Sequence, residues 1–121
     1  AEHIGGSEGG FVSMMNEYAR RLGMNASSFS NSTGLPDPNL YTTASDLAKL
    51  ARAMIAEFPE YYPWYRVKSF TYNNIPQPNR NTLLQRDETV DGLQTGHTRS
   101  AGYCLISTAK RDDTRLIAVV M

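Results

Sequence analysis

The sequence predicts an α+β domain in which a helical part comes first and three antiparallel strands follow. Two amphipathic segments occupy the first half of the 121 residues, and three alternating apolar runs, 92–98, 101–110 and 114–120, close the chain. Runs of this length joined by short polar turns pair as an antiparallel meander, with the helices packed on one side of the sheet. We therefore expect a single domain, with a helical part at 1–66 and a part of strands and loops at 67–121.

Two helices are predicted from their caps and their apolar spacing. Ser7 is suited to cap a helix that runs to Leu22, and Gly23 is suited to end it. Thr43 is the expected cap of the second helix, with Asp46 at the capping-box position. Apolar residues three and four positions apart give each helix one buried face. The faces comprise Phe11, Met15, Tyr18 and Leu22 in the first helix, and Leu47, Leu50, Ala51, Met54, Ile55 and Phe58 in the second.

The middle of the chain is predicted to be mostly irregular. Residues 25–41 are rich in Ser, Asn, Gly and Pro, and residues 74–81 contain two prolines, so both are expected to be loops. Residues 67–73 alternate as a strand does. Pro59 and Pro63 bracket an aromatic run that we interpret as a short helical turn followed by a bend. A surface flap packed on the helices is favoured over an aromatic shelf for a ligand, because aromatic side chains mostly contribute buried area. The run comprises Tyr61, Tyr62, Trp64 and Tyr65.

Composition excludes several classes of partner. Twelve basic and twelve acidic side chains give a formal net charge of zero, so neither nucleic acid nor an anionic membrane is an expected partner. No stretch approaches the ~20 apolar residues of a membrane span. Two distant histidines and one cysteine give no metal-ligand spacing, so we predict no metal and no cofactor. The single Cys104 cannot form an internal disulfide and is expected to be a small buried hydrophobe.

The two ends suggest a piece of a longer protein. Residues 1–4 read as the end of a helix without a cap, and residues 116–121 form an apolar strand with no turn after it. We expect the chain to be a fragment. A truncated sheet leaves edges unpaired around Thr95 and along the last strand, and exposed apolar edges favour pairing with another chain. Homodimerisation or strand exchange is therefore a further hypothesis.

Several segments of the sequence, taken in order, carry a family resemblance. They read FSNSTGLPD at 29–37, YTTASDLA at 41–48, NRNTLL at 79–84, VDGLQTGHT at 90–98, AGYCL at 101–105 and RLIAVVM at 115–121. Together they resemble the penicillin-binding serine D-alanyl-D-alanine carboxypeptidases of the peptidase S11 type, in which the fourth segment reads VDGxKTGHT. Ordered segments spread over about a hundred residues are far more specific than a lone Thr-Gly pair.

The resemblance implies a fold, a reaction and a set of roles. It implies part of a β-lactamase/transpeptidase-like domain and a serine acyl-enzyme that removes the terminal D-alanine from peptidoglycan pentapeptides and is acylated by β-lactams. Thr95 would contact the substrate carboxylate, Gly96 would allow close approach, and the backbone N–H of His97 would be an oxyanion donor. Arg80 would point toward the same carboxylate. Without the resemblance, His97 would be read as an exposed strand residue and Arg80 as a solvated loop charge.

Two features depart from the family pattern. Gln94 occupies the position of the lysine in K-T-G, and glutamine carries no positive charge and transfers no proton. A charge-assisted hydrogen bond contributes roughly 1.5–3 kcal/mol, so its loss would slow acylation by an order of magnitude or more. The S-x-N motif and the S-x-x-K motif with its nucleophile are absent from their places. The literal match at Ser107 and Lys110 lies in a predicted strand, where the two side chains fall on opposite faces.

Two functions remain open at this stage. The first is an enzyme fragment that derives from a D-Ala-D-Ala carboxypeptidase and is inactive as an isolated chain. The alternative is a non-catalytic module that binds a peptidoglycan stem peptide or a protein partner. Gln94 and the absent motifs favour the module if the truncation is natural, whereas the form of the two ends favours an excised fragment. The resemblance alone implies a location in the periplasm or at the outer face of the cytoplasmic membrane.

Overall fold

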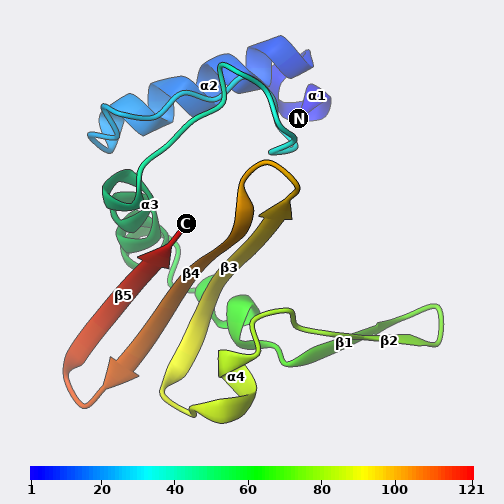
Figure 1. Cartoon of the computed structure of the whole chain (residues 1–121), viewed down its shortest axis with the longest axis vertical. Coiled ribbons are helices and arrows are strands. Elements are labelled where there is room, and N and C mark those ends of the chain that lie inside the picture. Colours follow the sequence, from blue (N-terminus) through cyan, green and yellow to red (C-terminus); the bar gives the residue numbers. More distant parts are fainter.

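The computed structural model describes all 121 residues and confirms the predicted α+β fold class (Figure 1). A helical first half is followed by a three-stranded antiparallel meander, and a two-stranded hairpin lies between them. None of the helices has the length and apolar character needed to span a membrane. The helices are α1 (Glu2–Gly5), α2 (Glu8–Arg21), α3 (Ala44–Glu57), the 3-10 helix η1 (Tyr62–Arg66) and α4 (Leu83–Arg86). The strands are β1 (Ser69–Tyr72), β2 (Ile75–Pro78), β3 (Val90–Thr98), β4 (Gly102–Arg111) and β5 (Thr114–Val120).

The main sheet has the order β3-β4-β5, so β3 and β5 each have an unpaired outer edge. Thr95 of β3 lies opposite Leu105 of β4, and the register shifts once, at a bulge between Val90 and Gly92. The predicted strand bounds are confirmed to within two residues. The tight turn between β4 and β5 places Asp112 at a φ of 51°, a left-handed conformation that aspartate tolerates better than most residues.

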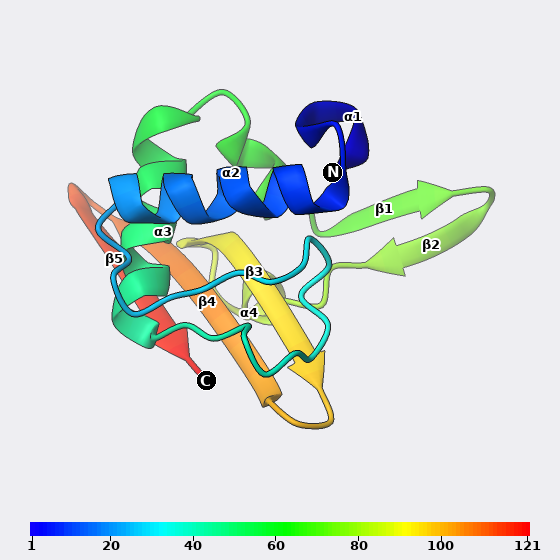
Figure 2. The same ribbon diagram turned by 90° about the horizontal axis from the view of Figure 1, so that it is seen from above.

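The region 74–81 is not the plain loop that its prolines suggested. Ile75–Pro78 forms β2 and pairs with β1, with Ser69 opposite Pro78. Asn73 and Asn74 both have positive φ, as the two central residues of a type I′ hairpin turn require. Every residue of both strands is exposed, and the hairpin extends away from the rest of the chain (Figure 2). Proline is tolerated here because a two-stranded hairpin consists only of edge strands.

The predicted helix caps are confirmed, although one detail was wrong. The Ser7 hydroxyl accepts a hydrogen bond from the Gly10 N–H (3.0 Å), and Thr43 accepts one from the Asp46 N–H (3.2 Å). Asp46 does not return a bond to its cap as a capping box would. Its carboxylate instead accepts from the Ala26 N–H (2.9 Å) and from the Ser27 hydroxyl (2.8 Å), and it also pairs with a lysine. The second predicted face also ends early, since Phe58 is 37% exposed.

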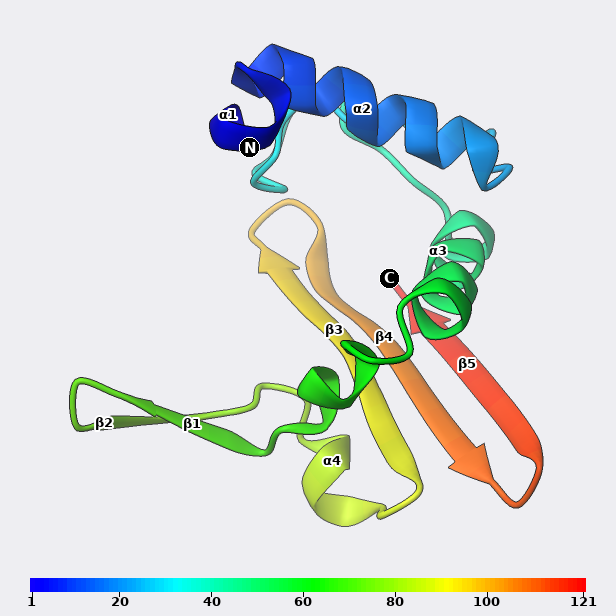
Figure 3. The same cartoon turned by 180° about the vertical axis from the view of Figure 1, so that it is seen from behind.

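Helices cover both faces of the sheet, contrary to the one-sided packing expected. Tyr62 of η1 is hydrogen-bonded to Thr108, whereas Leu84 of α4 packs with Val90 and Ala109. Consecutive residues of a strand point to opposite faces, so Thr108 and Ala109 place η1 and α4 on opposite sides. Helix α3 lies beside β5, and α2 lies apart from the sheet (Figure 3). Thirteen of the 121 residues are buried, so single contacts in this small core carry much of its stability.

The aromatic run packs only in part. Tyr62 is buried, whereas Tyr61 and Trp64 are exposed, Trp64 by 70%. Cys104, expected to be buried, is only partly so.

We predict that Gly92→Ala destabilises the chain. A Cβ at Gly92 would lie 2.7 Å from the Tyr62 hydroxyl oxygen and 3.1 Å from Thr108 Oγ1, and overpacking of this kind costs about 1–3 kcal/mol. Gly9→Ala is the matched control, because a Cβ there meets nothing within 4 Å and alanine stabilises a helix by up to about 1 kcal/mol. Urea unfolding should show opposite shifts of the midpoint. Equal midpoints for Gly92→Ala and the unmodified chain would contradict the packing described.

We also predict that Asp46 makes stability sensitive to acid. The Lys49 ammonium, helped by Ser27 and Ala26 and opposed by burial, holds the pKa of the Asp46 carboxyl below its ordinary value of 3.8. A depressed folded-state pKa contributes stability that is present above the unfolded value and is lost as pH falls through the folded value. Asp46→Asn should lower the thermal midpoint at pH 7 on the order of 5 °C, and the gap should close below pH 3.8. Asp113→Asn, at an exposed and unpaired position, should leave the midpoint unchanged at both pH values.

Candidate active site

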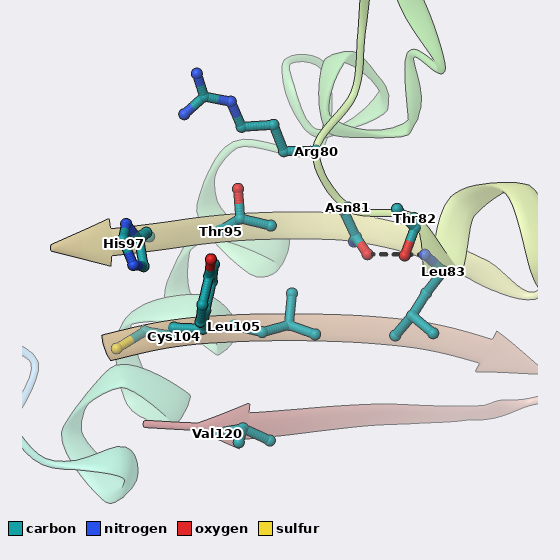
Figure 4. A pocket seen from close by; sticks show the side chains of 11 residues that line it. Arg80, Asn81, Thr82, Leu83, Thr95, His97, Cys104, Leu105 and Val120 are labelled. Atoms are coloured by element: carbon teal, nitrogen blue, oxygen red, sulfur yellow. Dashed lines mark hydrogen bonds between the residues drawn. The ribbon is translucent and has the colours of Figure 1, made fainter. Parts of the chain in front are cut away.

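One cavity gathers most of the predicted site residues. It has a volume of about 580 Å³ and lies where the segment before α4 faces β3 and β4 (Figure 4). Arg80, Thr95, Gly96 and His97 all line it. The sequence did not indicate the rest of the lining, because those residues reach the cavity through sheet pairing or through the α4 turn. They are Asn81, Thr82, Leu83, Tyr103, Cys104, Leu105 and Val120.

The pleat of β3 sorts the predicted residues between two faces. Thr95 and His97 point to one face, together with their partners Leu105 and Tyr103 across the ladder. The rings of His97 and Tyr103 pack in a tilted arrangement, with centroids 4.2 Å apart and ring planes 35° apart. The cavity therefore has a hydroxyl and an imidazole along one strand, and an apolar floor from the next.

Arg80 is a free cation at the rim of this cavity. Its side chain is exposed, forms no hydrogen bond or ion pair, and extends above β3 on the side of Thr95 (Figure 4). The three ion pairs of the structure involve other basic residues, at positions 49, 111 and 115. A guanidinium with five unused donors and a neighbouring hydroxyl form a suitable site for a carboxylate.

Gln94 lies on the opposite face from Thr95. Its amide Nε2 donates to the Thr95 carbonyl oxygen at 2.9 Å, and its side chain is exposed. It lines a second cavity of about 460 Å³, together with the loop residues Thr33, Gly34 and Leu35. Residues 95–97 of β3 line both cavities. The Thr95 hydroxyl lies on the face of the first cavity, and the Gln94 side chain lies on the face of the second.

The beginning of β3 is held by a polar network in which Tyr62 and Thr108 are buried and Asp91 and Arg115 are partly buried. Arg115 Nη1 donates to both carboxylate oxygens of Asp91 (2.7 and 2.6 Å), and Thr108 donates to the same carboxylate at 2.8 Å. Tyr62 shares a hydrogen bond with Thr108, and burial raises the pKa of the Tyr62 phenol. The network has no free nucleophile or base, so its chemistry is structural.

The literal S-x-x-K match has no catalytic arrangement. Ser107 is buried in β4 and donates weakly to the Gly92 carbonyl oxygen (3.5 Å), whereas Lys110 is exposed on the same strand. Gly96 remains a predicted point of close approach, although within this chain a Cβ there would meet only Cys104, at 3.9 Å.

Comparisons with known proteins agree with the resemblance seen in the sequence. The sequence model of the D-alanyl-D-alanine carboxypeptidase family, peptidase S11, matches residues 1–121. D-alanyl-D-alanine carboxypeptidase DacC of Escherichia coli K12 is 43% identical, covering all of this chain and 30% of the relative. Penicillin-binding protein 5 from Haemophilus influenzae superposes with a TM-score of 0.93 at 45% identity, covering 99% of this chain and 36% of that one.

A further solved relative carries a β-lactam. Penicillin-binding protein D2 from Listeria monocytogenes, described in its ampicillin-bound form, has a TM-score of 0.82 and 33% identity, covering 91% of this chain and 47% of that one. The chain thus spans about a third of the length of the curated relative and less than half of each solved structure. Because the family's sequence model covers every residue and the solved relatives share the fold, this chain belongs to the D-alanyl-D-alanine carboxypeptidase family.

Proposed function

We propose that this chain forms the carboxylate-binding wall of a serine D-Ala-D-Ala carboxypeptidase that acts on peptidoglycan stem peptides. This wall consists of Arg80, Thr95, Gly96 and His97. The observation that carries the proposal is the shared cavity of about 580 Å³, in which an unpaired Arg80 stands over Thr95 and His97. A stem peptide that ends in D-alanine presents a free carboxylate, which a guanidinium and a hydroxyl bind by charge-assisted hydrogen bonds. Family membership supplies the reaction class.

The unpaired edge of β3 provides a place for the scissile peptide bond. An edge strand presents unused N–H and C=O groups, and a peptide can lie along it as an added strand. In this arrangement the backbone N–H of His97 would donate to the oxyanion of the tetrahedral intermediate. Gly96 would let the peptide approach the strand closely. The serine nucleophile and its lysine base would belong to the rest of the whole protein.

A β-lactam is the second ligand we propose for the same wall. The Listeria relative bound to ampicillin shares the fold of this chain, and a β-lactam carboxylate would meet Arg80 and Thr95 as the substrate carboxylate does. Because the substrate is part of the cell wall, we further propose that the whole protein acts in the periplasm or at the outer face of the cytoplasmic membrane.

Gln94 favours one alternative function. A neutral amide that donates to the Thr95 carbonyl oxygen keeps the strand ordered, but it cannot move a proton. A whole protein with this residue could bind stem peptides without hydrolysing them efficiently.

The free edges of β3 and β5 also allow a second copy to pair with the sheet.

We predict that N-acetyl-D-alanyl-D-alanine binds at the first cavity. In an NMR titration at millimolar peptide, amide shifts should be confined to the neighbourhood of Arg80, Thr95 and Gly96, because these residues surround the expected carboxylate position. Gly9, in α2, serves as the remote reference signal. Absence of shifts at millimolar peptide, or shifts centred on α2, would contradict the proposed binding wall.

We also predict that Gln94→Lys accelerates acylation of the whole protein. A lysine adds a charge-assisted bond, which corresponds to a rate gain of about tenfold or more. Labelling by a fluorescent penicillin, followed over time, measures the rate. Gln77→Lys is the matched control, because it adds the same charge on the exposed β2 strand. Equal rates for Gln94→Lys and the unmodified protein would show that the position does not limit acylation.

A further inference from the structure

Arg80 is held between two asparagines whose side chains bind backbone rather than solvent. Asn81 is 2% exposed, and its amide Nδ2 donates to the Gly92 carbonyl oxygen at 2.9 Å. Its Oδ1 accepts from the Leu83 N–H at 3.2 Å, which supports the first turn of α4. Asn81 therefore ties the segment that carries Arg80 directly to β3.

Asn79 anchors the same segment on its other side. Its Nδ2 donates to the Val67 carbonyl oxygen at 3.0 Å, and its Oδ1 accepts from the Asn81 N–H at 2.9 Å. The Asn79 N–H also donates to the Lys68 carbonyl oxygen at 2.9 Å. The two asparagines thus connect the end of η1, the segment 79–81 and β3 in one chain of hydrogen bonds.

The Arg80 side chain itself has no partner that could hold it in place. Its position depends on where the backbone of residue 80 lies relative to Thr95. Gly92, the anchor point on β3, precedes Thr95 by three residues, roughly 10 Å along an antiparallel strand. A fixed anchor at this distance limits the volume that the guanidinium samples, and pre-organisation of a binding group raises affinity by lowering the entropy lost on binding.

We propose that Asn81, assisted by Asn79, is a positioning residue for carboxylate recognition by Arg80 and Thr95. The inference rests on the proposed function, because it concerns how the same wall distinguishes a free carboxylate from other peptide ends. Asn81 is among the residues that line the cavity, but Nδ2 and Oδ1 of its side chain are both hydrogen-bonded to the backbone. It sets the distance between the guanidinium and the hydroxyl through the Gly92 carbonyl.

The test compares two peptides that differ only in charge at the C-terminus. N-acetyl-D-alanyl-D-alanine and its C-terminal amide are titrated into the chain, and the readout is the dissociation constant of the amide divided by that of the acid. The unmodified chain should bind the acid about tenfold more tightly than the amide, and Arg80→Ala should remove that preference. Asn81→Ala should lower the ratio by about threefold or more, with little further loss in an Arg80→Ala background.

The ratio separates positioning from a general loss of structure. A merely structural role would weaken both peptides equally and leave the ratio unchanged. Asn79→Ala should also lower the ratio. Because Asn79 is less buried than Asn81, this variant provides the test if Asn81→Ala does not fold. Asn25→Ala is the control, because Asn25 is exposed and its side chain makes no hydrogen bond.

Two results would overturn the inference in distinguishable ways. If Arg80→Ala lowers the ratio while Asn79→Ala and Asn81→Ala leave it unchanged, the positioning role is wrong and the proposed function stands. If the unmodified chain binds neither peptide, or binds both equally, the proposed carboxylate wall fails and the positioning role fails with it.

Discussion

The candidate site depends on how firmly the first residues of β3 are held. Gly92 packs so closely on Tyr62 that a single methyl group would not fit, and its carbonyl oxygen accepts from Asn81. The residue before it, Asp91, pairs with Arg115 across the sheet. Contacts from η1, β5 and the segment before α4 therefore converge on two consecutive residues. Because this chain has few buried side chains, these polar and packing contacts, rather than a large apolar core, hold the start of β3 in place.

Because the start of β3 is fixed, the face of the sheet on which each later side chain lies is fixed as well. Side chains alternate between faces along a strand, so a slip of one residue would exchange the faces of Gln94 and Thr95. The bulge between Val90 and Gly92 sets this phase before the site begins. Thr95 and Arg80 consequently share one face by virtue of contacts made several residues earlier.

The sequence predicted the elements whose signals are local. Ser7 and Thr43 are caps that act within one helical turn, and both were confirmed. The β2 strand was missed because prolines usually interrupt strands, although the consecutive asparagines Asn73 and Asn74 are a recognisable signal for a type I′ turn. The spacing predicts that the Asp46 side chain completes the cap of its own helix. In the structure, its carboxylate instead accepts a hydrogen bond from Ala26, in a loop twenty residues earlier. Motif spacing predicted the residues of the candidate site, and four of them line one cavity. Their division between the two faces of β3 and the burial of Asn81 depend on long-range contacts, which the motifs do not encode.

Compared with the lysine that the family resemblance implies at position 94, Gln94 would lower the positive charge of the proposed site without removing all of it. With glutamine on one face of β3, Arg80 is the only lysine or arginine side chain that lines the first cavity. In the proposed site a carboxylate would depend on a single guanidinium, which has no acidic partner and whose backbone segment is anchored by Asn79 and Asn81. Recognition of a carboxylate and transfer of a proton are separate tasks in this family's chemistry. In the proposed site Arg80 and Thr95 would serve the first task, whereas Gln94 has no ionisable group with which to serve the second.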